Sequence, residues 1–295
     1  MRIFEWLKAV LYGIVEGITE WLPISSTGHL ILFEDLLPFA FTSDAAFLEE
    51  YTEMFQVVIQ LGAILAVAVL FWGRLWPFGA GKTPLEKRNT WSLWLKVVVA
   101  SLPAALIGVV GDKILEKVSG KDIDGWLYNS VVVAAALIVY GVAFLLVERF
   151  QRTRTARVES VEAISYKTAL FIGCFQTLSL VPGTSRSGST ILGAMTLGLS
   201  RTAGAEFSFF MAIPVMLGAG GIKMLGFFEY LGESGVAVPM DAWIVLAIGC
   251  LVSFVVSLVA IRFLMDFVKK HSFAPFGVYR IVLGAAVLIG WVLGA

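Results

Sequence analysis

The chain has 295 residues, of which 58% are hydrophobic and only 15% are charged, and its mean hydropathy is +0.86. Soluble domains have about 45–50% apolar residues, so this composition excludes a soluble globular protein and indicates an integral membrane protein. The formal net charge is zero, and this balance gives no reason to expect a nucleic-acid partner. Cys174 and Cys250 lie in apolar segments, which predicts core-filling thiols and neither a disulfide framework nor a metal cluster.

Six runs along the chain are long enough to cross a hydrocarbon core as helices, which takes about 20 mostly apolar residues. They cover residues 54–73, 92–111, 128–147, 207–228, 242–263 and 276–294. Two further apolar regions, 4–37 and 166–199, are each interrupted by a polar stretch that contains Pro23 or Pro182. Because proline breaks a helix, each region is predicted to be a re-entrant hairpin of two short helices joined by a loop.

The two interrupted regions resemble each other in sequence. A 15-residue interval separates two glycines in each region, namely Gly13 and Gly28, then Gly173 and Gly188. We therefore predict an all-α polytopic protein with one membrane domain, 1–295, and internal repeats at about 1–150 and 160–295. Each repeat would hold one hairpin and three spans, and since three is odd, the second repeat would have the inverted topology known from transporter folds.

The charges of the connections agree with this topology. Basic residues gather at 74–88, 149–157 and 262–270, and acidic residues gather at 34–50 and 229–241. The predicted topology puts the basic connections on one side, which the positive-inside rule makes cytoplasmic. Both termini are then expected on the outer side.

Glu16 and Glu20 stand four residues apart in the first hairpin and share one face of its first helix. Two carboxylates in an apolar setting persist most easily when they share a cation or a proton, or meet a positive partner. A hard divalent cation, Mg²⁺ or Ca²⁺, suits such oxygen ligands. The alternative is an interfacial pair that reaches water.

Ser26 and His29 lie one helical turn apart, where the second short helix is expected to begin after Pro23. His29 could accept the Ser26 hydroxyl proton and so create a nucleophile. Two simpler roles stay open: any hydroxyl among Ser25, Ser26 and Thr27 could be the helix N-cap, and a lone intramembrane histidine could be a packing residue.

Arg186 lies in the second polar stretch, and its guanidinium offers a rigid fork of donors suited to phosphate. The hydroxyl-bearing residues predicted to bind substrate with it are Ser25, Thr27, Ser185, Ser187 and Thr190. The alternative is an arginine that neutralises Glu16 or Glu20 across the interface between the repeats.

The two polar stretches differ in chemistry, because Gln176 stands in the second region where Glu16 stands in the first. Carboxylates and a histidine from one copy and an arginine from the other would together provide what phosphoryl transfer needs. Glu206, Lys223 and Arg280 can each be placed toward the end of an apolar segment, and we interpret them as structural.

Three motifs carry a resemblance to a known family over essentially the full chain: residues 16–20, 23–29 and 182–188. The chain resembles the bacterial undecaprenyl-diphosphatase family, also called bacitracin-resistance proteins. The resemblance implies an inner-membrane enzyme that hydrolyses undecaprenyl diphosphate to undecaprenyl phosphate and inorganic phosphate, which recycles the lipid carrier for peptidoglycan and confers bacitracin resistance. It also implies divalent-cation dependence and an active site open to the periplasmic side.

By the same resemblance, Glu16 and Glu20 match the acidic motif, Ser26 and His29 the nucleophile and its helper, and Arg186 the phosphate-binding arginine. Attack by Ser26 and attack by a metal-activated water fit the same residues. An alternative function is an inverted-repeat transporter or flippase of an anionic lipid phosphate, although a pure carrier would not need Ser26 and His29 beside two carboxylates. A homodimer is possible, and the sequence does not specify the oligomeric state.

Overall fold

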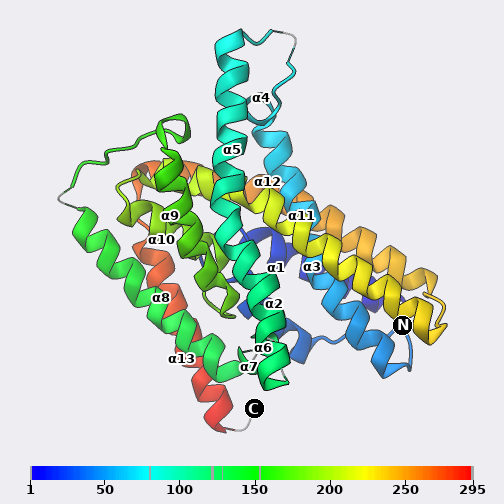
Figure 1. The fold of residues 1–295 in the computed structure, drawn as a ribbon. Coiled ribbons are helices and arrows are strands. Elements are labelled where there is room, and N and C mark those ends of the chain that lie inside the picture. Colours follow the sequence, from blue (N-terminus) through cyan, green and yellow to red (C-terminus); the bar gives the residue numbers. More distant parts are fainter. Residues whose placement is uncertain (1, 80, 121–122, 128, 153, 294–295) are drawn as a thin grey trace.

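The computed structural model describes residues 2–79, 81–120, 123–127, 129–152 and 154–293, and within those ranges it contains helices and no β-strand (Figure 1). Six helical segments are long and apolar enough to cross a membrane, which confirms the predicted spans. They are α3 (Ala45–Leu70), α5 (Pro84–Leu106) with its continuation to Ser119, α8 (Ser130–Gln151), α11 (Arg201–Ser234), α12 (Met240–Lys270) and α13 (Ala274–Leu293).

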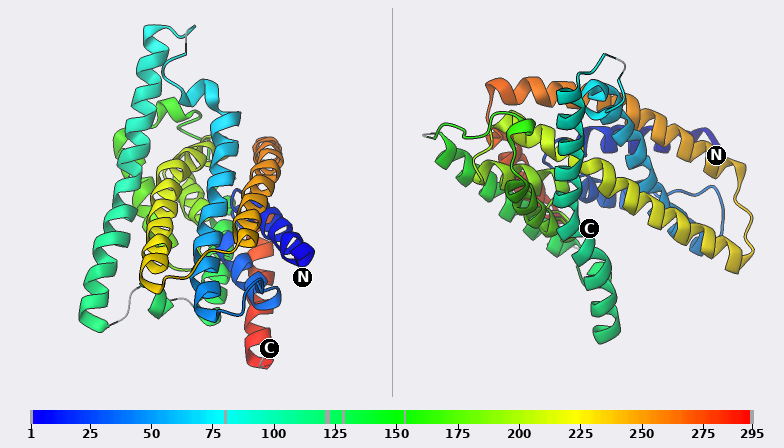
Figure 2. Two further views of the ribbon diagram at one scale, coloured as in Figure 1. Left: turned by 90° about the vertical axis from the view of Figure 1, so that its right-hand side faces the viewer. Right: turned by 45° about the horizontal axis from the view of Figure 1, so that its top comes forward.

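The continuation of α5 passes through a π-helical turn, Ile107–Gly111, into α6 (Asp112–Ser119). In the left view of Figure 2, α5 and this continuation run along one side of the molecule for most of its height. Three short elements lie in the connections, namely α4 (Trp72–Leu75), α7 (Ile123–Leu127) and η2 (Val161–Ala163).

Each interrupted region forms a helix, a loop and a second helix, as predicted. The first comprises α1 (Arg2–Thr19) and α2 (Ser26–Leu36). The second comprises α9 (Tyr166–Gln176), the short η3 (Thr177–Leu180) and α10 (Arg186–Thr196). The predicted acidic connection at 34–50 is mostly helical, because α2 extends to Leu36 and α3 begins at Ala45 behind its N-cap Asp44.

The first helix of each pair packs closely on a helix from the other half of the chain: α1 lies along α12, and α9 lies along α5. A glycine allows each approach. A Cβ atom on Gly13 would lie 2.8 Å from the Gly249 carbonyl oxygen in α12, and one on Gly173 would lie 2.1 Å from the Ala100 carbonyl oxygen in α5. Other large contacts join α3 to α11 and α12, α10 to α9 and α11, α11 to α5, and α8 to α13.

Two apolar clusters hold the paired helices in place. One packs Trp21, from the first loop, and Ile191, from α10, with the aromatic run Phe207, Phe209 and Phe210 of α11. The other is aromatic and joins α1 to α3 through Tyr12, Phe39, Tyr51 and Phe55. α9 also contributes Ala169 and Ile172 to the first cluster, so both loops follow helices that are packed in the core.

The prediction that both cysteines fill the core is wrong for Cys174, which is exposed, while Cys250 is half-buried. A helix in a bilayer is apolar on its lipid-facing side as well as on its packed side. An apolar run therefore does not indicate which of its residues point inward.

Candidate functional site

The two polar loops begin their second helices in the same way. Ser25 is the N-cap of α2, and its hydroxyl accepts a hydrogen bond from the Gly28 amide at 3.3 Å. Ser185 is the N-cap of α10, and its hydroxyl accepts from the Gly188 amide at 3.1 Å. Both serines have positive φ, 76° and 70°. The N-cap role thus falls to these two serines, and the residues that follow them, Ser26 and Arg186, begin the helices.

Glu20 joins the two loops. Its Oε2 accepts a hydrogen bond from the Ser26 hydroxyl at 2.6 Å, and its Oε1 accepts one from Arg186 Nη2 at 2.8 Å. The Ser187 hydroxyl donates to the Glu20 backbone carbonyl at 3.0 Å. The Glu20 side chain is buried, so these charge-assisted bonds form away from solvent, where they are strongest. Residues predicted from the two halves of the chain are brought together here.

Arg186 is held from a second direction by the backbone of α11. Its Nη1 donates to the Ser208 carbonyl at 2.8 Å, and its guanidinium carbon lies 6.0 Å from the centre of the Trp21 ring. The alternative predicted for Arg186, an ion pair with Glu16 or Glu20, is met by Glu20. Its Nε is buried and has no hydrogen-bond partner among the described residues, so one donor stays available to an anion.

Glu16 is fully buried one turn before Glu20, and neither carboxylate oxygen has a hydrogen-bond partner in the described part of the chain. An unpaired buried carboxylate is costly, and such groups are normally paired or coordinate a metal. The described residues contain no group of three or more His, Cys, Asp or Glu side chains that could hold a metal. A hard cation would therefore use Glu16 and Glu20 and take its other oxygens from substrate phosphate and water, which is the usual arrangement for Mg²⁺. The residues fit such an ion.

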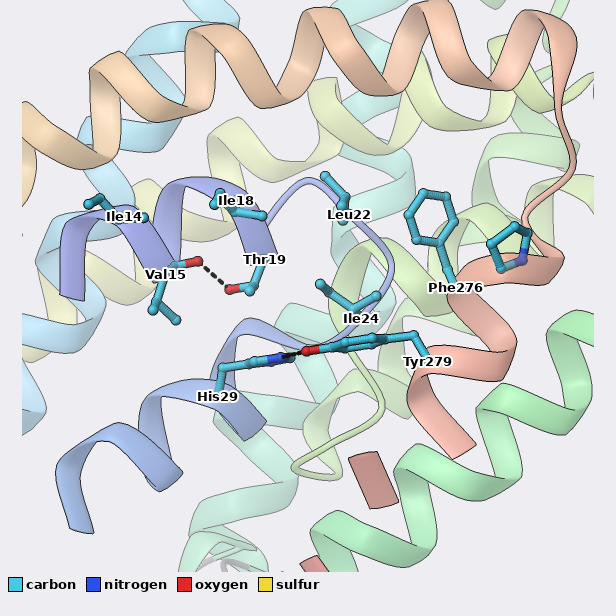
Figure 3. A pocket seen from close by; sticks show the side chains of 10 residues that line it. Ile14, Val15, Ile18, Thr19, Leu22, Ile24, His29, Phe276 and Tyr279 are labelled. Carbon is cyan, nitrogen blue, oxygen red and sulfur yellow. Dashed lines mark hydrogen bonds between the residues drawn. The ribbon is translucent and has the colours of Figure 1, made fainter. Parts of the chain in front are cut away.

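His29 is bound on both ring nitrogens. Nδ1 lies 2.6 Å from the Ser25 carbonyl, and Nε2 lies 2.7 Å from the Tyr279 hydroxyl of α13 (Figure 3). Since a carbonyl only accepts, Nδ1 carries the proton, and a neutral ring then accepts from Tyr279 at Nε2. Within the described structure the predicted pairing of His29 with Ser26 is not formed, because the Ser26 hydroxyl donates to Glu20 instead.

The remaining predicted hydroxyls take two kinds of position. Thr190 Oγ1 lies 2.6 Å from Ser208 Oγ, in the buried interface of α10 and α11. Thr27 lines a cavity of about 710 Å³ whose wall also includes Gln56, Glu53 and Lys223. Of these two threonines, Thr27 lies at a polar cavity, where a substrate group could reach it. The Thr190 side chain instead joins α10, the helix that carries Arg186, to α11.

Arg280 has a position that the sequence interpretation missed. Predicted toward the end of an apolar segment, it is fully buried and donates to the carbonyl of Pro23 at 3.1 Å, of Gly183 at 2.7 Å and of Thr184 at 2.9 Å. One guanidinium thus bonds to both polar loops. An arginine directly after Tyr279 in an otherwise apolar helix was the available signal, since a charge at membrane depth needs partners.

The other two residues interpreted as structural form ion pairs: Glu206 with Arg74, and Lys223 with Glu53 at 2.7 Å, the second pair in the wall of the cavity that Thr27 lines. Both pairs join segments that are distant in sequence, which agrees with a structural role.

Comparisons with known proteins cover nearly the whole chain. Residues 9–286 match the family described as "Bacitracin resistance protein BacA". Proteins named undecaprenyl-diphosphatase from Streptococcus pyogenes serotypes M3 and M1 are each 51% identical to this chain over 289 residues, which is 98% of this chain and 97% of the relative. The matched region includes both polar loops and Arg280. The chain therefore belongs to the BacA family of bacitracin resistance proteins.

Proposed function

We propose that this protein is a phosphatase of the membrane that hydrolyses undecaprenyl diphosphate to undecaprenyl phosphate and inorganic phosphate. The reaction recycles the lipid carrier for peptidoglycan and other cell-wall polymers and confers resistance to bacitracin. Family membership and the names of relatives at 51% identity support this function. The structural observation that carries it is the buried Ser26 hydroxyl bonded to Glu20, whose other oxygen binds Arg186.

These residues suggest a route for the reaction. Ser26 Oγ attacks the terminal phosphorus while its proton passes to Glu20, which already accepts its hydrogen bond at 2.6 Å. The anhydride P–O bond breaks, and undecaprenyl phosphate leaves with that oxygen. Water then hydrolyses the phosphoserine and releases inorganic phosphate. Direct attack by water would use the same Glu20 and Arg186.

Arg186 and His29 have different positions relative to the reacting groups in this proposal. Arg186 binds phosphate oxygens with donors that include Nε, which is buried and unpartnered among the described residues. His29 can serve Ser26 as a base only after it releases Tyr279 from Nε2. In the observed geometry Glu20 is the nearer proton acceptor.

We further propose that a divalent cation, Mg²⁺ or Ca²⁺, binds at Glu16 and Glu20. The support is the fully buried Glu16 carboxylate, which has no partner within the described residues. Such an ion, when bound, neutralises the charge that develops on the phosphoryl oxygens. Glu20 would keep its hydrogen bonds to Ser26 and Arg186 while it also binds the ion.

Phosphate release tests the function and the cofactor together. Purified protein in detergent is expected to release inorganic phosphate from undecaprenyl diphosphate, to lose this activity in EDTA and to regain it with excess Mg²⁺ or Ca²⁺. The absence of release with any divalent cation would overturn the enzymatic function. Release that EDTA leaves unchanged would remove the cation from the proposal while keeping the phosphatase.

The finer architecture is also a proposal: the two halves are inverted repeats, and the α1–α2 and α9–α10 pairs are re-entrant hairpins. Three pairs of features correspond under exchange of the halves, which supports it. The packing of α1 on α12 corresponds to that of α9 on α5, and the packing of α3 on α12 corresponds to that of α11 on α5. The N-cap Ser25 corresponds to Ser185.

We place the protein in the bacterial inner membrane with its active site open to the periplasmic side. In support, α4 and the connection between α8 and α9, which carry basic residues, lie at the upper end of the molecule in Figure 1, whereas the C-terminus lies at the lower end. A homodimer also stays a proposal.

A further inference from the structure

A second polar cavity, of about 460 Å³, lies at the end of α10 that is opposite to Arg186, beside the upper end of α8 in Figure 1. No aspartate or glutamate is among the described residues that line it. Two guanidiniums and three neutral hydrogen-bonding side chains therefore make this cavity, the α8–α10 pocket, cationic. The polar residues in its wall are Arg154, Arg157, Gln151, Thr155 and Thr196.

The charges of Arg154 and Arg157 are not compensated by the protein. Neither side chain forms an ion pair or a hydrogen bond with another residue that the structure describes. The acidic residue of α8, Glu148, is buried and binds Arg201 through both carboxylate oxygens, at 2.9 and 2.5 Å. The positive-inside rule explains why arginines gather in this connection, but it does not explain why two of them share one cavity that holds no acidic partner.

Backbone hydrogen bonds hold Arg157 at the pocket. Its amide donates to the Gly198 carbonyl at 2.9 Å, and the next residue, Val158, accepts from the Ser200 amide at 2.8 Å. Gly198 has a φ of 92°, and a Cβ atom there would lie 3.7 Å from Arg157 Cδ, so the arginine side chain packs over the turn that follows α10. This wall of the pocket is thus a hydrogen-bonded turn.

The pocket lies next to an apolar stripe on the surface of α8. The stripe is formed by residues at intervals of three and four, which share one face of a helix, and they are between 42% and 64% exposed. Such a face in a membrane-spanning helix contacts acyl chains. A lipid that lies along the stripe would have its head group near the arginines, because the stripe ends four residues before Arg154. Its members are Val139, Val142, Leu146 and Phe150.

This arrangement matches an amphiphile with a negative head group. We propose that the α8–α10 pocket binds the phosphate of an anionic phospholipid whose acyl chains lie along α8. Guanidinium groups bind phosphate through paired, charge-assisted hydrogen bonds, and basic pockets between membrane-spanning helices on the cytoplasmic side suit anionic lipid head groups. The site is separate from the catalytic one, since α10 runs from Arg186 to Thr196 between them.

A lipid bound in this way would stabilise the fold. The Arg154 amide donates to the Gln151 carbonyl at the end of α8 at 3.2 Å, whereas Arg157 is bonded to the turn after α10. A phosphate held by both guanidiniums therefore joins α8 to α10. Because such a ligand binds the folded protein only, it raises the unfolding temperature.

Thermal unfolding of the delipidated protein in a neutral detergent tests the proposal. Phosphatidylglycerol should raise the unfolding midpoint by at least about 3 °C. Phosphatidylcholine or inorganic phosphate at the same concentration should shift it by less than about 1 °C. The double variant Arg154→Gln/Arg157→Gln should lose the shift but keep the wild-type midpoint, within about 1 °C, in detergent alone. The matched control Lys87→Gln/Arg88→Gln removes two exposed charges from another basic connection and should keep the shift.

Three results would overturn the site: no shift with phosphatidylglycerol, an equal shift with phosphatidylcholine, or an equal loss of the shift in both double variants. A shift caused by inorganic phosphate alone, and lost in the pocket variant, would overturn the lipid as the occupant and leave an anion site.

A second measurement needs only the wild-type protein. Phosphatidylglycerol with a photoreactive group on its head should label the segments that contain Arg154 and Thr196, and unmodified phosphatidylglycerol should compete. Labelling confined to other segments, or displaced equally by phosphatidylcholine, would contradict the proposal.

Discussion

The Ser26 hydroxyl is available for chemistry because Ser25, and not Ser26, caps α2. Ser25 takes the N-cap role with the Gly28 amide, which leaves the Ser26 hydroxyl free to donate to Glu20 at 2.6 Å. A hydroxyl whose proton already has a carboxylate acceptor is the kind of group that becomes a nucleophile. Sequence spacing alone assigned the cap to any of three neighbouring hydroxyls and could not make this distinction.

Replacing Ser26 by alanine should separate the two routes of attack. If Ser26 is the nucleophile, Ser26→Ala should lower the rate of phosphate release at least about a hundredfold, a barrier increase of about 2.7 kcal/mol. Ser101→Ala is the control, since the buried Ser101 hydroxyl donates only to the Val97 carbonyl within α5. Near wild-type turnover of Ser26→Ala would indicate water as the attacking group.

Much of the site could be predicted because polar side chains at membrane depth are rare and expensive. That reasoning brought Glu20, Ser26 and Arg186 together, and the structure places them in one hydrogen-bonded chain. The partner of His29 could not be found in this way. Tyr279 is separated from it by 250 residues, and a tyrosine in an apolar helix is as well explained by packing.

At the scale of the elements, the two loops are held by a third helix. Arg280 of α13 bonds to carbonyls in both loops. Loop carbonyls inside a membrane protein have no water to bind, so each needs a protein donor. α13 thus acts as the common support for loops that lie about 160 residues apart in the chain.

Removing that support should uncouple the loops. Arg280→Met keeps an apolar stem but removes all three hydrogen bonds to the loops, and bonds to a charged donor are each worth about 1.5–3 kcal/mol. We expect phosphate release to fall at least about a hundredfold and the thermal unfolding midpoint in detergent to drop. Arg280→Lys should be intermediate, because one ammonium cannot reproduce the planar fork.

Arg262→Met is the matched control, since Arg262 is an exposed residue of the neighbouring span α12. Full activity of Arg280→Met would show that the loops keep their geometry without α13.

The spans were predicted in the right places, but several helices are longer than their apolar runs. α12 was predicted at 242–263 and extends over Met240–Lys270. A helix need not end at the edge of the hydrocarbon core, because its internal hydrogen bonds also form in water. Lys269 and Lys270 in its last turn also favour the negative end of the helix dipole. Hydropathy therefore marks the membrane boundary rather than the helix end.

At the scale of the whole molecule, the main question is how the two halves are oriented in the membrane and how they pack together. The sequence predicted their number and order from one glycine interval and the charges of the connections. It could not predict which helices meet across the halves, such as α1 on α12 and α9 on α5, because such contacts depend on close backbone approaches rather than on hydropathy.

The proposed topology can be tested with reporters. Alkaline phosphatase fused after Ala295 should be active, and a fluorescent protein at the same point should be dark, because both termini are expected in the periplasm. Fusions after Lys270, in a basic connection, should behave in the opposite way. A fluorescent C-terminal fusion would reverse the orientation and, with it, the side to which the active site opens.

The positive φ angles of Ser25 and Ser185 have a consequence for engineering. Ser25 and Ser185 occupy φ values of 76° and 70°, a region where a side chain costs about 1–3 kcal/mol and glycine costs little. Exchanging serine for glycine at such positions is a standard way to make a protein more heat-resistant. Here it would delete the two hydroxyls that begin α2 and α10, the helices that present Ser26 and Arg186. Substitution by glycine at these two residues would therefore relieve backbone strain but remove the N-caps of the helices that carry Ser26 and Arg186. Stabilising substitutions for this enzyme should be sought at other positions in the fold.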